Sequence, residues 1–291
     1  MRIAVVIATT GRRDVVERTA PLWARQSRAF DAMILSAASA EDVGPTARAV
    51  SGCSVVVGPK GLCAQRNTAL NALAGACDVV VFADDDYVPS RRFLEQTETI
   101  LDAHSDIVAL TGHVLADGIN TAGLSFDAAL RLVEEADSAP PPRRFTIIPA
   151  NHAYGCNMAI RVSAAPDLRF DERLPLYAWM EDLDFSRRIG RFGRVARAME
   201  LVGVHMGVKS GRQSGVRLGY SQVANLAYLA RKGSMPWSEA LAQIARNVIA
   251  NSVRVLMPEP WVDRQGRLRG NLLALRDALA GRQRPERVLE L

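Results

Sequence analysis

Three consecutive carboxylates, Asp84, Asp85 and Asp86, follow the apolar run VVVFA at residues 79–83. Adjacent like charges at the end of a buried strand repel one another, so a compensating cation is expected beside them. In extended backbone alternate residues share a face, which predicts that Asp84 and Asp86 project together and that Asp85 points away. Two carboxylates on one side suit Mg²⁺ or Mn²⁺. An acidic turn that caps the following helix is the alternative.

A second acidic pair, Glu181 and Asp182, precedes apolar residues at helical spacing, Phe185, Ile189 and Phe192. The pair therefore falls in the first turn of a predicted helix, where the helix dipole favours the ionised carboxylate. An ionised carboxylate can accept a proton from a substrate hydroxyl. The alternative is ordinary acidic charge at a helix N-terminus.

An arginine is predicted on the apolar face of a third segment. Residues 61–74 have the pattern of a helix, and Arg66 lies between Leu62 and Leu70 on its apolar stripe. A buried guanidinium needs an anionic partner, which the acidic triplet or a bound phosphate could supply. Asn67 beside it offers an amide donor and acceptor. A guanidinium that extends to solvent at the sheet edge is the alternative.

The elements that must position these residues alternate between strands and helices. Short apolar, β-branched runs occur at residues 3–8, 32–37, 54–58, 78–83 and 106–115, with helical patterns between them. Such runs predict an α/β fold with a mostly parallel central sheet flanked by helices. Ligands of open α/β sheets bind at the carboxyl ends of the strands. Thr9, Thr10 and Arg12 follow the first predicted strand, and the acidic triplet follows the fourth.

The composition excludes several classes of protein. The 291 residues are 48% hydrophobic and 23% charged, which is typical of a folded globular chain and excludes extensive disorder. Four irregularly spaced cysteines indicate buried thiols in a reducing compartment. The first residues are interpreted as a strand rather than a signal peptide, and no apolar run is long enough to cross a bilayer. A cytoplasmic location is therefore expected.

The positive charge is concentrated in the last part of the chain, where residues 206–291 carry 14 Lys and Arg against 6 Asp and Glu. In a predicted helix at 234–257, one stripe contains Trp237, Leu241, Ile244, Val248 and Val255. Packing of this helix against the catalytic domain is favoured. Docking on the inner face of an anionic membrane is the alternative. No pattern of a nucleic-acid-binding element is present, so nucleic acid is not an expected partner.

Taken in order, six segments resemble glycosyltransferase family 2. They are IATTGR, GLCAQRNTAL, VVVFADDDYVP, YGCNMAIRVSA, RFDERLPLYAWMEDLDFSRRIGRFG and VGVHMG, within about the first 207 residues. The resemblance implies a GT-A-like fold and an inverting transfer of a sugar. The donor would be a nucleotide-diphosphate sugar and the acceptor a hydroxyl of a glycan or lipid-linked molecule, as in polysaccharide biosynthesis. At the end of strand two, where the family often has an acid that contacts the base, this chain has LSAAS.

The resemblance also implies a metal centre and a catalytic base. Asp84 and Asp86 match the DxD motif, with Asp86 on a Mn²⁺ or Mg²⁺ ion and Asp84 on the ribose or a metal-bound water. His205, at the end of a strand predicted at 199–206, matches a third metal ligand of some members. Asp182 matches the catalytic base, and Glu181 would orient the acceptor or the metal shell.

The remaining candidate residues would bind the donor: Thr9, Thr10, Arg12, Arg66, Asn67, Asp84, Asp85, Lys209 and Arg212. Lys209 and Arg212 lie in a Gly- and Ser-rich loop at 206–215, whose composition suits a lid over a diphosphate. A flexible linker is the alternative for this loop.

We expect a catalytic domain at 1–214, with its nucleotide-sugar part at about 1–115 and its acceptor part at about 116–214, followed by a helical extension at 215–291. Two other functions compete with this interpretation. A non-catalytic sugar-nucleotide-binding protein is disfavoured by the intact acids at 84, 86, 181 and 182. A nucleotidyltransferase is disfavoured because TTGRRD is a poor match to the glycine-rich first loop of those enzymes.

Overall fold

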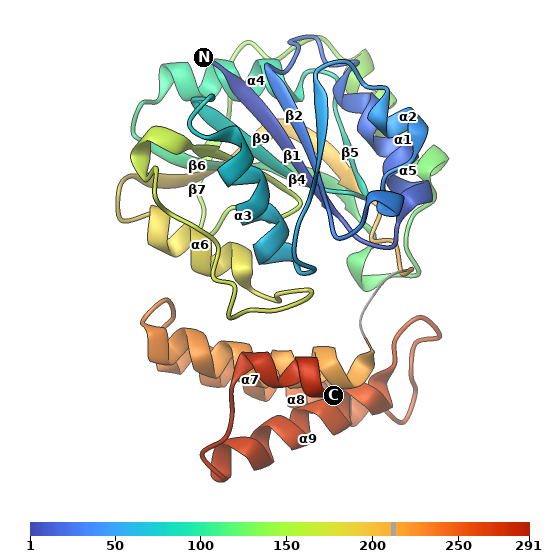
Figure 1. Ribbon diagram of the computed structural model, residues 1–291, viewed down its shortest axis with the longest axis vertical. Coiled ribbons are helices and arrows are strands. Elements are labelled where there is room, and N and C mark those ends of the chain that lie inside the picture. Colours follow the sequence, from blue (N-terminus) through green and yellow to red (C-terminus); the bar gives the residue numbers. More distant parts are fainter. Residues whose placement is uncertain (211–213) are drawn as a thin grey trace. The chain divides into compact units, whose positions relative to one another are not determined.

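The computed structural model describes residues 1–210 and 214–291, which form two compact units (Figure 1). The sheet unit comprises Met1–Lys60, Ala64–Arg169 and Phe185–Gly211. The helical unit comprises Gly61–Cys63, Phe170–Asp184 and Arg212–Leu291. The domain boundary expected at residue 214 stays a prediction.

The strands of the described residues form one nine-stranded sheet in the order β3-β2-β1-β4-β8-β6-β9-β5, with β7 paired to β9. Their bounds are β1 Ile3–Thr9, β2 Ala32–Ala37, β3 Cys53–Val57, β4 Val79–Asp84, β5 Tyr87–Pro89, β6 Ile107–Asp117, β7 Ile147–Pro149, β8 Asn157–Arg161 and β9 Arg194–His205. The pairs β2–β3, β1–β2, β1–β4 and β6–β9 are parallel, whereas β8, β5 and β7 pair antiparallel. The predicted mostly parallel α/β sheet is confirmed.

Helices of the sheet unit cover this sheet. Their bounds are α1 Arg13–Trp23, α2 Pro45–Arg48, α4 Phe93–Ala103 and α5 Phe126–Ser138, while α3 Leu62–Leu73 and α6 Glu181–Ile189 cross from one unit to the other. Short 3₁₀ helices occur at Ala40–Asp42, Gly118–Asn120 and Val162–Ala164. Strand β1 is buried from Ile3 to Ile7, as expected for a central strand covered on both faces. Trp23 of α1 and Tyr87 of β5 both make edge contacts with Phe93 of α4, at centroid distances of 5.8 and 5.9 Å.

Three parallel strands end at one edge of the sheet. Strand β8 is antiparallel to both β4 and β6, and β9 is parallel to β6, so β4, β6 and β9 run in the same direction. Their last residues are Asp84, Asp117 and His205. Strand β5 begins at Tyr87, directly opposite His205, which brings the turn residue Asp86 to the same edge. The topology therefore gathers three carboxylates and one imidazole.

Two glycines allow the ends of β6 and β9 to meet. Gly207 has a left-handed φ of +65°, and a Cβ there would lie 2.2 Å from the carbonyl carbon of Gly118. A Cβ on Gly118 would lie 1.9 Å from the carbonyl oxygen of Met206. Backbone touches backbone at this point, and neither position has room for a side chain.

The helical unit contains α7 Gly215–Lys232, α8 Trp237–Arg254, α9 Arg264–Leu279 and the 3₁₀ helix η4 Pro285–Glu290. Its buried core includes Tyr220 and Val223 of α7 and Ala274 of α9, with Ile244 and Val248 of α8 packed against them. The C-terminal helices are confirmed. Of the described helices, none combines the length and apolar character needed to span a bilayer.

The apolar stripe predicted for residues 234–257 is only partly covered. Trp237 is 48% exposed and Leu241 57% exposed, whereas Ile244 and Val248 pack in the core. Helix α8 ends at Arg254, so Val255 follows the helix rather than belonging to it. The periodicity identified an apolar face correctly, and the helical unit covers only its middle.

Replacing Gly207 by alanine is expected to destabilise the protein by about 2–4 kcal/mol, because the new Cβ meets backbone atoms and the left-handed conformation is unfavourable. Gly75 is the matched control, since it has φ +76° and open space around it. Gly75→Ala should cost only about 1 kcal/mol. Urea denaturation of both variants measures the difference, and equal losses would contradict the close approach.

Candidate active site

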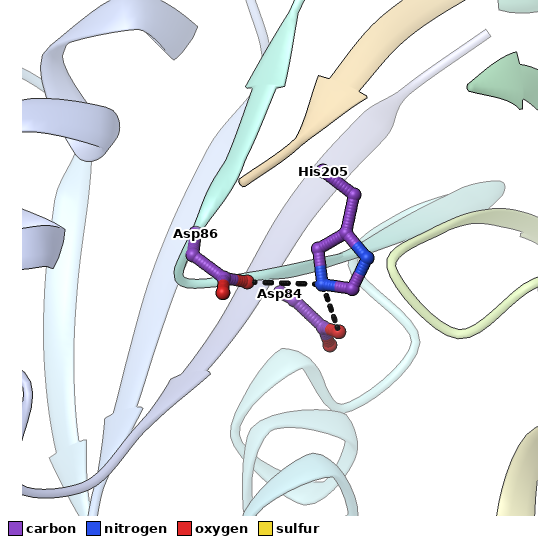
Figure 2. Close-up of side chains that lie close together, drawn as sticks. All are labelled: Asp84, Asp86 and His205. Atoms are coloured by element: carbon purple, nitrogen blue, oxygen red, sulfur yellow. Dashed lines mark ion pairs between the residues drawn. The ribbon is translucent and has the colours of Figure 1, made fainter. Parts of the chain in front are cut away.

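Asp84, Asp86 and His205 form a cluster at the carboxyl edge of the sheet. Each offers one ligand atom, and these atoms all lie within 4.8 Å of one another. The Nε2 atom of His205 is 3.2 Å from Oδ1 of Asp86 and 3.8 Å from Oδ2 of Asp84 (Figure 2). Asp86 and His205 are buried, while the Asp84 side chain keeps 30% exposure, which leaves the cluster open on one side.

The backbone reaches this arrangement by a turn. Strand β4 ends at Asp84, and Asp85 and Asp86 form the tight turn that leads into β5. The expectation that Asp84 and Asp86 lie together and Asp85 points away agrees with the structure. The expectation of an extended backbone through all three residues is wrong.

Two further residues hold the imidazole of His205. Its Nδ1 lies 3.0 Å from Oδ1 of Asp117, and the Tyr154 hydroxyl donates to Oδ2 of the same carboxylate at 2.9 Å. A carboxylate on one ring nitrogen orients the other toward a ligand, as in many metal centres. Neither residue was predicted from the sequence, because the fifth strand was expected to end at residue 115. Asp117 ends that strand in the structure and would have been found by the same search of strand ends.

The charges in the cluster stabilise one another. Burial alone would lower the pKa of His205, but hydrogen bonds and charges of Asp117 and Asp86 raise it to about 10. Burial would raise the pKa of Asp86, but His205 and Arg12 outweigh that effect and lower it to about 2. The imidazolium therefore serves as a counterion of the aspartates.

The two oxygens of Asp86 have different surroundings. Oδ2 accepts a hydrogen bond from the backbone N–H of Val208 at 2.7 Å. Oδ1 is buried, forms the ion pair with His205 at 3.2 Å and makes no well-aligned hydrogen bond among the described residues. A buried carboxylate oxygen needs positive charge beside it, which a bound cation would supply in addition to the imidazolium. Two carboxylates and one oriented imidazole are donors that fit a divalent cation.

Asp85 is hydrogen-bonded to residues of the loop after β1. It accepts hydrogen bonds from Oγ1 of Thr9 at 2.9 Å and from Nη1 of Arg12 at 2.8 Å. Burial raises the pKa of Asp85 to about 6, although Arg12 and Thr9 favour its charged form. Arg12 also donates to the carbonyl oxygens of Ser210 and Val208 at 2.9 and 3.2 Å. These contacts tie the loop after β1 to the segment after β9.

Arg66 has the partner that its position on an apolar face required. It is fully buried on α3, with Nη2 3.2 Å from Oδ1 of Asp84 and 2.8 Å from the carbonyl oxygen of Gly155. Asn67 is buried beside it. Thr10 donates to the Thr9 carbonyl at 2.8 Å. The roles of these residues in donor binding stay predictions.

The predicted lid is only partly described. The ammonium group of Lys209 donates to the carbonyl oxygens of Gly118 and Ile119 at 2.8 and 2.9 Å, in the short 3₁₀ helix after β6. Arg212 lies outside the described residues.

Glu181 and Asp182 begin α6, as predicted from the sequence. Glu181 is buried and Asp182 is half-buried, and Oδ1 of Asp182 accepts a hydrogen bond from the Leu183 N–H at 2.8 Å. The preceding loop contains three non-glycine residues with positive φ, namely Leu176, Ala178 and Met180 at +58°, +53° and +75°. This conformation is unfavourable for such residues and clusters at functional sites.

Contacts within the helical unit hold the strained loop. The Leu176 carbonyl accepts from the Leu62 N–H at 2.8 Å, and the Trp179 carbonyl accepts from the side-chain amide of Asn225 at 2.9 Å. Asp184 is buried against Lys232 at 2.8 Å and Ser234 at 2.5 Å. No local sequence pattern signals these contacts, because they join residues about 50 positions or more apart.

No protein-family model matches the sequence, and no curated protein matches it. Solved structures do resemble it. A mannosyltransferase from Pyrobaculum calidifontis in complex with GDP-Man and Mn²⁺ has a TM-score of 0.57 at 15% identity, covering 96% of this chain and 87% of that one. S. aureus TarS 1–349 in complex with UDP-GlcNAc has a TM-score of 0.52 at 15% identity, covering 99% and 83%. The mixed α/β fold is therefore one found in glycosyltransferases.

Mn²⁺ is expected to bind the wild-type protein at one site and to be lost from Asp86→Asn, which removes the buried carboxylate of the cluster. Asp117→Asn should weaken binding about 10- to 100-fold, because the imidazole loses the group that orients it. The measurement is titration calorimetry, supported by the electron paramagnetic resonance of free Mn²⁺.

Asp102→Asn is the control, since it removes one exposed carboxylate on α4. Mn²⁺ binding that survives Asp86→Asn, or that falls equally in the control, would exclude the cluster as the metal centre.

Proposed function

We propose that this protein is a metal-dependent, inverting glycosyltransferase of the family 2 type. It would move a sugar from a nucleotide-diphosphate donor to a hydroxyl of a glycan or lipid-linked acceptor. The observation that carries the proposal is the Asp84, Asp86 and His205 cluster at the carboxyl edge of a glycosyltransferase-like sheet. The resembling structures contain GDP-Man with Mn²⁺ and UDP-GlcNAc, which supports a nucleotide-sugar donor.

Asp86, Asp84 and His205 would hold the cation, Mn²⁺ or Mg²⁺. When bound, the cation would offset the negative charge that develops on the departing nucleoside diphosphate. Asp117 would keep Nε2 of His205 directed at the aspartates throughout. Because Oδ2 of Asp86 is fixed by the Val208 N–H, its other oxygen is the one directed at the cluster.

The fixed cations would position the donor. Arg12 and Arg66 are held by carboxylates and carbonyl oxygens, so both guanidinium groups are preorganised before a ligand arrives. Thr9, Thr10, Asn67 and Asp85 would line the nucleotide side with them. Lys209, in the segment after β9, would bind the diphosphate.

Asp182 would be the general base. It lies in the first turn of α6, and its carboxylate can accept the proton of the acceptor hydroxyl as the hydroxyl oxygen attacks the anomeric carbon. Attack opposite the leaving diphosphate inverts the anomeric configuration in one step. Glu181 would orient the acceptor. The strained loop at 176–180 supports a functional role for this helix start.

Asp182→Asn should retain donor binding and lose at least about 10³-fold in transfer rate, because the amide cannot take the proton. A panel of nucleotide sugars with Mn²⁺ first identifies the donor by nucleoside diphosphate release. Calorimetry then measures donor affinity and the release assay measures the rate.

Asp167→Asn, on an exposed side chain, is the matched control. Transfer by Asp182→Asn within about tenfold of wild type would refute the base assignment. Donor binding by the wild type without any release of nucleoside diphosphate would favour the non-catalytic alternative.

We also propose a peripheral contact of the C-terminal helices with the inner face of an anionic membrane. Around the end of α8, Val253 is 62% exposed, Leu256 81% and Met257 85%, next to the exposed Arg254, which pairs with Glu259 at 2.9 Å. Exposed apolar side chains on a helix of a basic segment are the pattern of interfacial helices.

Vesicles that contain an anionic lipid should sediment the wild-type protein at low salt and release it at high salt, because the electrostatic part of binding is screened. Leu256→Asp/Met257→Asp should abolish sedimentation, and Leu289→Asp, also exposed but on η4, should not. Sedimentation that changes neither with salt nor with the double substitution would contradict this contact.

A further inference from the structure

The helical unit contains a cationic cavity of about 600 Å³. Its polar lining comes from three segments, the loop before α6, the end of α7 and the connection from α9 to η4. The polar side chains are Arg173, Tyr228, Arg231, Lys232, Gln283 and Arg284. Four of them are cations, and no carboxylate belongs to the lining that the described residues provide.

The four cations differ in how their charges are balanced. Lys232 lies 2.6 Å from Asp171 and 2.8 Å from Asp184, so its charge is matched. Arg173 has Glu286 at 2.7 Å, and Arg284 has Glu290. Arg231 contacts only Oε1 of Gln283, at 3.5 Å from each terminal nitrogen, and has no carboxylate within 4 Å in the described part of the chain. One guanidinium therefore carries an unmatched charge at the cavity.

Arg173, in the loop before α6, keeps hydrogen-bond donors that its pair with Glu286 does not use. A guanidinium group has five N–H donors, and Arg173 uses Nε for Glu286. Glu286, outside the lining, fixes this side chain, and Tyr228 supports it, with its ring centroid 4.7 Å from Cζ of Arg173. The Tyr228 hydroxyl donates to Asp171 at 2.7 Å, which fixes the ring as well. The lining is thus preorganised, which lowers the cost of binding an anion.

We propose that this cavity binds a phosphate or diphosphate group, with Arg231 as its principal ligand and Arg173 and Arg284 completing the contact. Guanidinium groups bind phosphate oxygens in a bidentate manner, and the volume lies within the range of small-molecule sites. The donor diphosphate has its own proposed cations in the sheet unit, Arg12 and Arg66. We therefore assign the cavity to a phosphorylated acceptor, and this assignment, unlike phosphate binding itself, rests on the proposed function.

Titration of the full chain with inorganic pyrophosphate in the presence of EDTA tests the site without metal in the sheet unit. Binding should weaken at least about tenfold in Arg231→Gln and further in Arg231→Gln/Arg284→Gln. Arg231→Lys keeps the positive charge but loses the planar guanidinium group that can bind phosphate through two N–H groups. Its affinity for pyrophosphate should lie between those of the wild type and Arg231→Gln. Arg231 and Arg284 are exposed, so the variants should keep the wild-type melting temperature.

Two controls separate binding at this cavity from a general effect of net charge and from binding in the sheet unit. Arg246→Gln removes an equal charge from an exposed position on α8, and Asp86→Asn alters the cluster in the sheet unit. Arg246→Gln should leave pyrophosphate binding unchanged, and Asp86→Asn should not weaken it, whereas an increase in Asp86→Asn would reveal additional binding in the sheet unit. Absence of binding by the wild type, or equal loss in either control, would overturn the proposal. If pyrophosphate binds as described but no nucleotide sugar is turned over, the proposed function fails and the phosphate site stands.

A second arm distinguishes the source of the phosphate. Vesicles of phosphatidylcholine with and without phosphatidic acid are sedimented with wild type and with Arg231→Gln/Arg284→Gln. Loss of the phosphatidic acid dependence in the double variant identifies a lipid-borne phosphate. Sedimentation unchanged by the double variant, together with weakened pyrophosphate binding, identifies a soluble phosphate ester.

Discussion

Three adjacent carboxylates, the partly exposed Asp84 and the buried Asp85 and Asp86, lie together at the end of β4 because a separate cation meets each of them. Arg66 of α3 meets Asp84, Arg12 before α1 meets Asp85, and His205 at the end of β9 meets Asp86. Burying a carboxylate without a partner would cost several kcal/mol. The turn is therefore stable only when all three cations are in place. They come from α3 after β3, from the loop after β1 and from the end of β9. The strand order that brings these elements together therefore also determines the charge balance of the site.

The three carboxylates divide their tasks. Asp85 accepts from Thr9 and Arg12 and thereby joins the loop after β1 to the segment after β9. Asp84 and Asp86 turn toward His205, and Oδ1 of Asp86 pairs with the imidazolium without a well-aligned hydrogen bond. The left-handed residues before Asp182 cost about 1–3 kcal/mol each. Both features lie where we propose chemistry, and local stability is commonly lower at functional residues.

Local patterns in the sequence were sufficient for the features that depend on local physics. Unbroken apolar runs predicted the central strands, and an arginine on an apolar helix face predicted an anionic partner for Arg66, of which the acidic cluster was one candidate and is the one found. Short strands such as β5, β7 and β8 were not predicted, because three to five residues carry no clear period and their pairing depends on distant partners. The ion pair of Asp184 with Lys232 joins residues 48 positions apart, and periodicity contains no information about it. For α8, periodicity identified the apolar face and left open what covers it.

Helix α7 links two features of the helical unit that the sequence presented separately. Through Asn225, Tyr228 and Lys232 it holds the segment 171–184, including the left-handed loop that leads to Asp182. The same end of α7 supplies Tyr228, Arg231 and Lys232 to the cationic cavity. Lys232 is shared, since its two carboxylate partners, Asp171 and Asp184, flank the strained loop on either side. The lining of the cavity and the loop that leads to the proposed base therefore share one ion-paired residue, Lys232, and one supporting helix, α7.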